Sequence, residues 1–200
     1  AKGRYKVLFA LLAGSGMRVG EALGLLVEHL TDDFSTIKIS QSAWRGKTQS
    51  PKTANAVREI DLHPSLAALV KTFVNGRTEG FLFPSASGRP LTQRNVLRNG
   101  FDKIREDLQL TQPGLGFHAF RRFRTSHLRK NRAPWDLEKF WLGHANKSVT
   151  DKYSEQLKED VEWRKAEAER IGLGFALDAK PLVGQLGQPE AKKAQSKKAA

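Results

Sequence analysis

Apolar residues recur every three or four positions over residues 6–26, interrupted by the small residues 13–16. This spacing predicts two helices joined by a tight turn. Residues 36–40 and 56–62 alternate between apolar and polar side chains and contain β-branched residues. We therefore expect two strands, connected by residues 44–55.

The remainder of the chain up to Gly172 has a mainly helical pattern. Residues 64–74 have a proline in their first turn and predict a helix, and Thr92 is a suitable N-cap for another helix that runs to about Leu108. Three further helical segments are expected, at residues 118–132, 134–142 and 148–170.

The composition changes after Gly172 to glycine, proline, glutamine, alanine and lysine. Such a segment buries too little apolar surface to offset its ordering entropy. We therefore expect a folded domain over residues 1–172 and a flexible basic tail over residues 173–200. The domain is expected to be mainly α, of the α+β type.

The overall composition limits the function classes. Lys and Arg number 34 against 21 Asp and Glu, which gives a formal charge of +13 over 200 residues and favours a polyanionic partner. The absence of cysteine excludes disulfides, thiolate zinc sites and cysteine catalysis. The longest apolar runs are much shorter than the roughly 18–20 residues of a membrane span, so we expect a soluble, cytoplasmic protein. Because the chain starts without Met, we also expect it to be a fragment.

Basic residues are concentrated between residues 118 and 132, a segment without any acidic side chain. Nucleic acid is the natural partner of such a helix, although a solvated helix face explains the segment alone equally well. The candidate DNA-binding residues outside the chemistry itself are Arg122, Arg124, Arg129, Lys130 and Arg132.

Five short motifs follow one another in a defined order. They are Ser15-Gly-Met-Arg-Val-Gly-Glu21, Pro51-Lys-Thr53, His118-Ala-Phe-Arg121, Leu142-Gly-His144 and Tyr153. Arg121 follows Arg18 by 103 residues, His144 follows Arg121 by 23, and Tyr153 follows His144 by nine. In order and spacing, over about residues 5–170, the chain resembles the catalytic domain of the tyrosine recombinase, or phage integrase, family.

Cutting a DNA strand without hydrolysis requires a nucleophile whose adduct preserves the bond for resealing, and the phenol of Tyr153 is the candidate. Guanidinium groups suit the charge on the non-bridging oxygens of the transition state, a role for Arg18 and Arg121. Lys52 is the candidate general acid for the departing 5′-oxygen. Of the other two catalytic positions, His118 is expected to donate to the same phosphate or to accept the tyrosine proton, and His144 is expected to support the phosphate. Glu21, one helical turn after Arg18, is expected to be structural.

The resemblance implies a mostly helical fold with a small antiparallel β-sheet and a 3′-phosphotyrosyl intermediate on double-stranded DNA. It also implies strand exchange in a homo-tetramer, docked through the helix after Tyr153, without metal or nucleotide cofactor. An association with the nucleoid would follow from DNA binding.

Family members usually carry an upstream domain that clamps the DNA, so we expect weak, salt-sensitive binding by this chain. Two alternatives remain: a type IB-like topoisomerase that uses the same residues, and a non-catalytic DNA-binding module.

Overall fold

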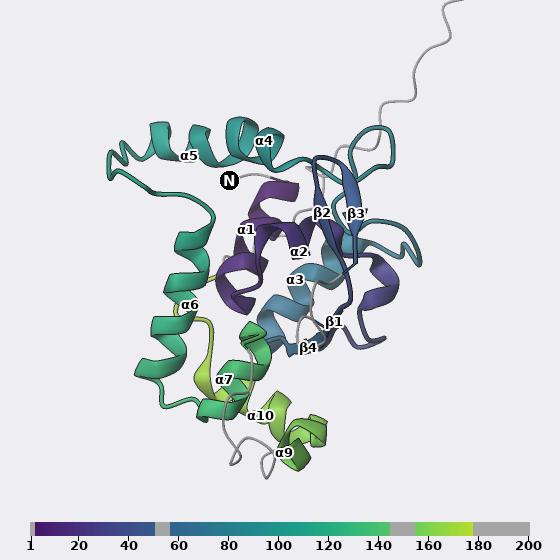
Figure 1. Cartoon of the computed structure of the whole chain (residues 1–200), viewed down its shortest axis with the longest axis vertical. Coiled ribbons are helices and arrows are strands. Elements are labelled where there is room, and N and C mark those ends of the chain that lie inside the picture. The colour runs from purple at the N-terminus through teal and green to yellow at the C-terminus, as the bar shows by residue number, and fades with distance from the viewer. Residues whose placement is uncertain (1–2, 51–56, 145–154, 178–200) are drawn as a thin grey trace, which may run out of the picture.

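The computed structural model describes residues 3–50, 57–144 and 155–177, and Figure 1 shows how their elements are arranged. A 3₁₀ turn covers Val27–His29, and a π-helical turn covers Leu97–Phe101. The helices are α1 (Arg4–Ser15), α2 (Val19–Gly24), α3 (Pro64–Val74), α4 (Gln93–Val96), α5 (Asp102–Asp107), α6 (His118–Lys130), α7 (Trp135–Leu142), α9 (Glu155–Glu159) and α10 (Val161–Ile171). The strands are β1 (Thr36–Ile39), β2 (Ser42–Trp44), β3 (Lys47–Gln49) and β4 (Arg58–Asp61).

Helix α1 lies at the centre of the domain, with α3 and α6 packed against it (Figure 1). Val7, Leu8 and Leu11 are fully buried, and most of the other residues of the helix are buried as well. A helix with apolar residues on all sides is stable only when it is covered on all sides. The first helix therefore forms the core around which the site-bearing segments are arranged.

Two small antiparallel sheets complete the mainly α fold. Strand β1 pairs with β4, with Ile37 opposite Ile60, as the alternation of apolar residues predicts. The hairpin of β2 and β3 was not predicted, and it overlaps the start of the segment 44–55, which was expected to be only a connection. Its turn residues Arg45 and Gly46 both have positive φ, 50° and 76°, which suits a two-residue hairpin turn. All three residues of β3 are exposed, so the sequence has no apolar alternation there that would reveal the strand.

Several predicted helix boundaries are confirmed, and one predicted helix is wrong in part. Thr92 caps α4, since its Oγ1 accepts a hydrogen bond from the Asn95 N–H at 3.2 Å. Helix α3 has the bounds expected from the sequence. The segment expected to be one helix up to residue 170 is broken at Asp160, whose carboxylate caps α10 by accepting from the Trp163 N–H at 2.9 Å. An aspartate favours a helix start over a helix interior, which explains the break.

Residues just beyond Gly172, where we expected the flexible tail to begin, still pack against the domain. Leu173 is buried in the core, and the ring of Phe175 lies 6.1 Å from that of Phe123 on α6. The rest of the predicted tail, residues 178–200, lies outside the described residues. Over the described ranges, none of the helices is long and apolar enough to cross a membrane.

Candidate active site

The turn between α1 and α2 presents Arg18. Helix α1 ends at Gly16, which has φ 71° and has no room for a Cβ, because that atom would lie 2.8 Å from a methyl group of Leu142. Arg18 is then the N-cap residue of α2. Glu21, at the third position of the helix, accepts hydrogen bonds from the Arg18 backbone N–H at 2.7 Å and from its Nη1 at 3.0 Å. The carboxylate of Glu21 thus fixes both the backbone and the side chain of Arg18.

Glu21 is itself held by Arg58 of β4, a residue that the sequence analysis did not single out. The Arg58 guanidinium donates to both carboxylate oxygens, at 3.1 and 2.9 Å, and its side chain is only 1% exposed. Burial would raise the pKa of the Glu21 carboxyl, but the contacts with Arg58 and Arg18 outweigh it, and the pKa is lowered. Glu21 is therefore ionised at neutral pH and accepts hydrogen bonds from both arginines. The only sequence signal for Arg58 was its position in a segment of alternating apolar and polar residues, which predicted a strand.

Helix α6 presents His118 and Arg121, which are one helical turn apart on the same face. The Nη1 of Arg121 donates to the Gly16 carbonyl at 2.9 Å, and its Nη2 donates to the Leu142 carbonyl at 2.5 Å. Burial, followed by the charge of Arg18, lowers the pKa of Arg121 to about 10, so the guanidinium remains charged at neutral pH. His118 is exposed at the first position of the helix, at the positive end of the helix dipole.

His144 reaches the same place from the end of α7. Trp141 attaches this end to β4 twice, because its carbonyl accepts from Arg58 Nε and its Nε1 donates to Asp61, both at 2.8 Å. Gly143 then adopts φ 66° and turns the chain. His144 Nε2 comes to lie 3.0 Å from Arg121 Nη2. Burial, and then the nearby arginine charges, lower the pKa of His144 below its usual 6.5, so the ring is neutral at pH 7.

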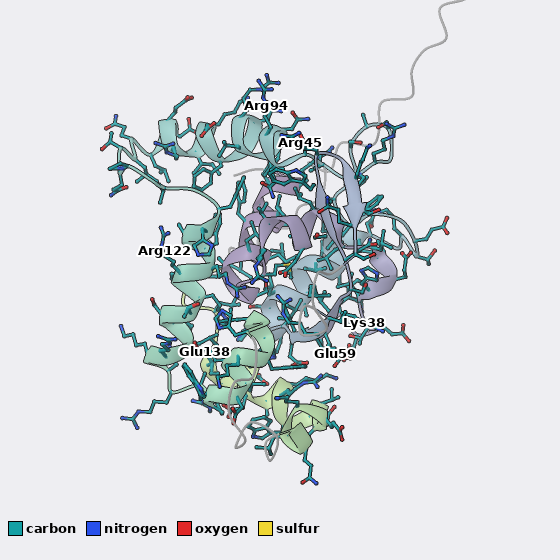
Figure 2. The ribbon with its side chains drawn as sticks, in the orientation of Figure 1. Lys38, Arg45, Glu59, Arg94, Arg122 and Glu138 are labelled. Atoms are coloured by element: carbon teal, nitrogen blue, oxygen red, sulfur yellow. The ribbon has the colours of Figure 1, made fainter. Side chains whose placement is uncertain are left out.

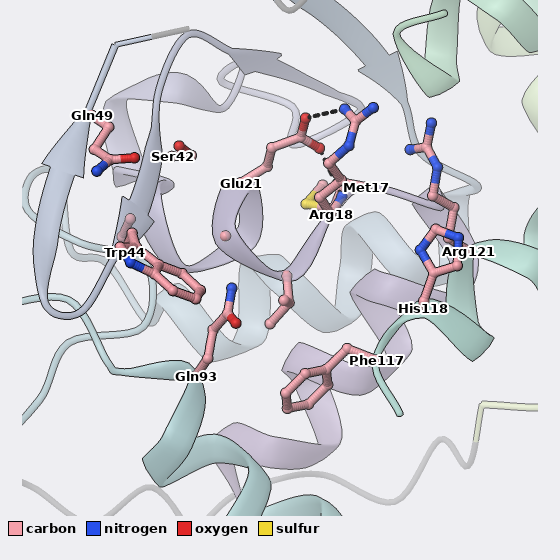
Figure 3. Close-up of a pocket in the computed structure, with 13 residues that line it drawn as sticks. Met17, Arg18, Glu21, Ser42, Trp44, Gln49, Gln93, Phe117, His118 and Arg121 are labelled. Atoms are coloured by element: carbon pink, nitrogen blue, oxygen red, sulfur yellow. Dashed lines mark hydrogen bonds and ion pairs between the residues drawn. The ribbon is translucent and has the colours of Figure 1, made fainter. Parts of the chain in front are cut away.

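Four of these side chains border one pocket of about 590 Å³. Arg18, Glu21, His118 and Arg121 all line it, and Figure 3 shows Trp44 and Gln93 on the other side. Trp44 and Gln93 were not expected from the sequence, because neither belongs to a recognised motif. Glu21 is the only acidic residue among the described residues that line the pocket. The pocket therefore carries net positive charge and suits an anion such as a phosphate.

Two of the six expected catalytic residues, Lys52 and Tyr153, lie outside the described residues. The other four are brought together: Arg18, His118 and Arg121 line the pocket, and His144 contacts Arg121. Within the described ranges, there is no group of three or more histidine and carboxylate side chains that could hold a metal ion.

The basic residues of α6 do not all lie on one surface. Arg122 and Lys130 are exposed on the helix, as is Arg132 just after it, and Figure 2 shows Arg122 pointing away from the body of the domain. Arg129 is also exposed but is ion-paired with the buried Glu138 at 3.1 Å.

Arg124 was expected to bind DNA, and this expectation is wrong. Its side chain is buried, because residues 121, 124 and 128 form the inward face of α6. Its Nη1 donates to the carbonyl of Gly172 at 2.6 Å. Burial lowers the pKa of Arg124 to about 10. Arg124 therefore attaches the segment after α10 to α6.

The fold and the site together define a class of protein: a mainly α domain with a positively charged, arginine-lined pocket that suits a phosphate group. The chain matches the model of the phage integrase family over residues 1–160, and it belongs to that family.

Among its relatives, the tyrosine recombinase XerC of Mesorhizobium japonicum is 30% identical, over 76% of this chain and 46% of the relative. A XerC-like tyrosine recombinase of Caldanaerobacter subterraneus subsp. tengcongensis is 25% identical, over 74% of this chain and 44% of the relative. The chain thus spans about half the length of these relatives.

Solved structures support the same fold. The Tn1549 transposon integrase, in complex with a circular intermediate DNA, superposes with a TM-score of 0.60 at 16% identity, covering 76% of this chain and 58% of that one. The integrase from mycobacterium phage Brujita superposes with a TM-score of 0.59 at 18% identity, covering 94% of this chain and 58% of that one.

Proposed function

We propose that this chain is the catalytic domain of a site-specific DNA recombinase, which cuts and rejoins strands through a 3′-phosphotyrosyl intermediate. The observation that carries the proposal is the convergence of Arg18, His118 and Arg121 on one pocket, with His144 3.0 Å from Arg121. The relatives are named tyrosine recombinases, which favours this function over a topoisomerase or a non-catalytic binding module.

In the proposed reaction, the Oη of Tyr153 attacks the scissile phosphorus while the bond from phosphorus to the 5′-oxygen breaks. Lys52 protonates the departing 5′-oxygen, and the phenol proton passes to His118 or to solvent. The product is a 3′-phosphotyrosyl bond and a free 5′-hydroxyl. Rejoining is the reverse, with a 5′-hydroxyl of the same or another strand attacking the phosphotyrosyl phosphorus.

Arg18 and Arg121 stabilise the pentavalent transition state by donating to its non-bridging oxygens. Arg121 is suited to this role because two backbone carbonyls already fix its orientation, so little reorganisation is needed when DNA binds. Arg18 is 52% exposed, so its remaining donors can reach a bound phosphate. His118 and His144 assist as hydrogen-bonding partners of the same phosphate.

Double-stranded DNA is the proposed partner, and it would associate the protein with the nucleoid. The Tn1549 transposon integrase, which has this fold, has been solved in complex with a circular intermediate DNA and with transposon right end DNA, which supports the proposal. Arg122, Lys130 and Arg132 are the proposed contacts to the DNA backbone. A homo-tetramer on DNA is proposed to form through α9 and α10, where Leu157 and Val161 are 49% and 37% exposed.

The test is covalent capture on nicked DNA duplexes, in which the cleaved end diffuses away and the adduct accumulates. Wild type should form protein–DNA adducts that resist denaturant, and Tyr153→Phe should form none while binding DNA normally. Enrichment of one sequence from a random library would support a recombinase, whereas adducts without sequence preference would support the topoisomerase. DNA binding without any adduct from wild type would contradict the proposed reaction.

A further inference from the structure

We propose that Arg58 is a positioning residue for strand cleavage, which joins the turn that carries Arg18 to the turn that carries His144. This inference rests on the proposed function, because it concerns the rate of the cleavage step. Arg58 itself is only 1% exposed at its side chain, so it acts through other residues and not by touching DNA.

The first contact of Arg58 is with Glu21. Each oxygen of this carboxylate accepts one hydrogen bond from Arg58 and one from Arg18: Oε1 from the two Nη1 atoms, and Oε2 from Arg58 Nη2 and the Arg18 backbone N–H. The planar guanidinium of Arg58 thus fixes the orientation of the Glu21 carboxylate, and that carboxylate in turn holds Arg18.

The second contact of Arg58 is with the end of α7. Its Nε donates to the Trp141 carbonyl at 2.8 Å. The guanidinium also lies directly beneath Gly143, where a Cβ would come within 2.9 Å of its Cζ and Nη1. His144 follows immediately. One buried guanidinium therefore supports both turns that bring charged or polar groups to the phosphate.

Loss of Arg58 should misplace Arg18. Glu21 would lose two of the four donors that the described part of the chain gives it. The Arg18 guanidinium would then be drawn toward the buried carboxylate and away from the phosphate. Because a misplacement of about 1 Å costs on the order of 10²-fold in rate, the cleavage step should slow by about that factor. DNA affinity should change little, since the phosphate contacts of the outer surface are unaffected.

The experiment compares Arg58→Met and Arg58→Lys with a control, Arg77→Met. Arg77 is less buried than Arg58, but it likewise donates to backbone carbonyls, those of Val74, Phe81 and Leu82, and it does not line the pocket. The rate of adduct formation at saturating nicked DNA should fall by about 10²-fold in Arg58→Met and by less in Arg58→Lys, which keeps the charge without the fork. Arg77→Met should lose stability in urea without losing capture rate.

Chemical rescue distinguishes positioning from general destabilisation. Guanidinium chloride, at a concentration that does not unfold the protein, should restore part of the rate of Arg58→Ala, and the same concentration of sodium chloride should not. Hydrogen exchange of the Arg18 amide, which donates to Glu21, should accelerate in Arg58→Met but not in Arg77→Met. This last measurement does not depend on activity.

The outcomes separate the two proposals. If wild type forms no adduct, the proposed function fails, and the Arg18 amide still reports whether Arg58 organises the turn. The inference about Arg58 is overturned if wild type is active and Arg58→Met captures DNA at the same rate. It is also overturned if the Arg58 and Arg77 variants lose rate equally, or if the Arg18 amide is unaffected by loss of Arg58.

Discussion

The substitution Gly143→Ala adds a single methyl group to the most crowded turn of the candidate site. Gly143 has φ 66°, a left-handed conformation that L-residues avoid, and it ends α7 immediately before His144. A Cβ at this position would lie 2.9 Å from Cζ and Nη1 of Arg58 and 3.0 Å from its Nε. Arg58 cannot move aside without loosening its hydrogen bonds to Glu21 and Trp141.

The expected cost follows from these two effects. The left-handed conformation costs an alanine roughly 1–2 kcal/mol, and the clash with a buried group adds about 1–3 kcal/mol. The lower entropy of the unfolded alanine chain returns about 0.4–1 kcal/mol. We therefore expect Gly143→Ala to lower the free energy of unfolding by about 3 kcal/mol. The matched control is Gly88→Ala, since Gly88 has φ 74° but nothing within 4 Å of its would-be Cβ. It should lose only about 1 kcal/mol.

Urea unfolding of both variants and capture on nicked DNA by the folded proteins provide the measurements. Gly143→Ala should be the less stable variant and should also capture DNA more slowly, because both Arg58 and His144 are displaced. Equal losses of stability in the two variants, or a normal capture rate in Gly143→Ala, would refute the reasoning that Gly143 is required for the packing of Arg58.

Three further predictions concern pH, salt and stability. Burial, and then the nearby arginine charges, lower the pKa of His144, and a phosphate bound beside the ring should offset the arginine charges. DNA affinity should then rise as the pH falls from neutral to about 5.5, and His144→Gln should weaken this rise in an anisotropy titration. Arg122→Ala should reduce the slope of log affinity against log salt by about 1, whereas Arg124→Met should leave the slope unchanged and lower the free energy of unfolding by about 1–3 kcal/mol. Asp61→Asn should destabilise the fold by about 3 kcal/mol in urea, because Asp61 pairs with the buried Arg164 at 2.9 Å. A loss below 1 kcal/mol would contradict that estimate.

Most of the fold could be predicted from local patterns in the sequence. Helix α3 and the cap at Thr92 follow from proline placement and capping chemistry, and the pairing of β1 with β4 follows from alternation. The β2–β3 hairpin could not be predicted in this way, because an exposed strand leaves no apolar period. The break at Asp160 was missed because the helical pattern on either side of it was treated as continuous.

The motifs in the sequence predicted which residues form the candidate site, but they did not predict how each side chain is buried or which groups it contacts. The motifs identified Arg18, His118, Arg121 and His144, which the structure brings together. Charge alone could not separate an inward-facing arginine from an outward-facing one on the same helix, and this is why Arg124 was misplaced.

The acceptors that hold these arginines explain why the site retains its positive charge. Arg121 donates to the carbonyls of Gly16 and Leu142, and Arg58 donates to that of Trp141. Backbone carbonyls orient a guanidinium without neutralising it, whereas a carboxylate at each position would cancel the charge needed for a phosphate. Glu21 is the exception, and it is shared between two arginines. Because carbonyl acceptors depend on how the chain turns and not on residue type, this part of the site is set by the fold and could not be found in the sequence.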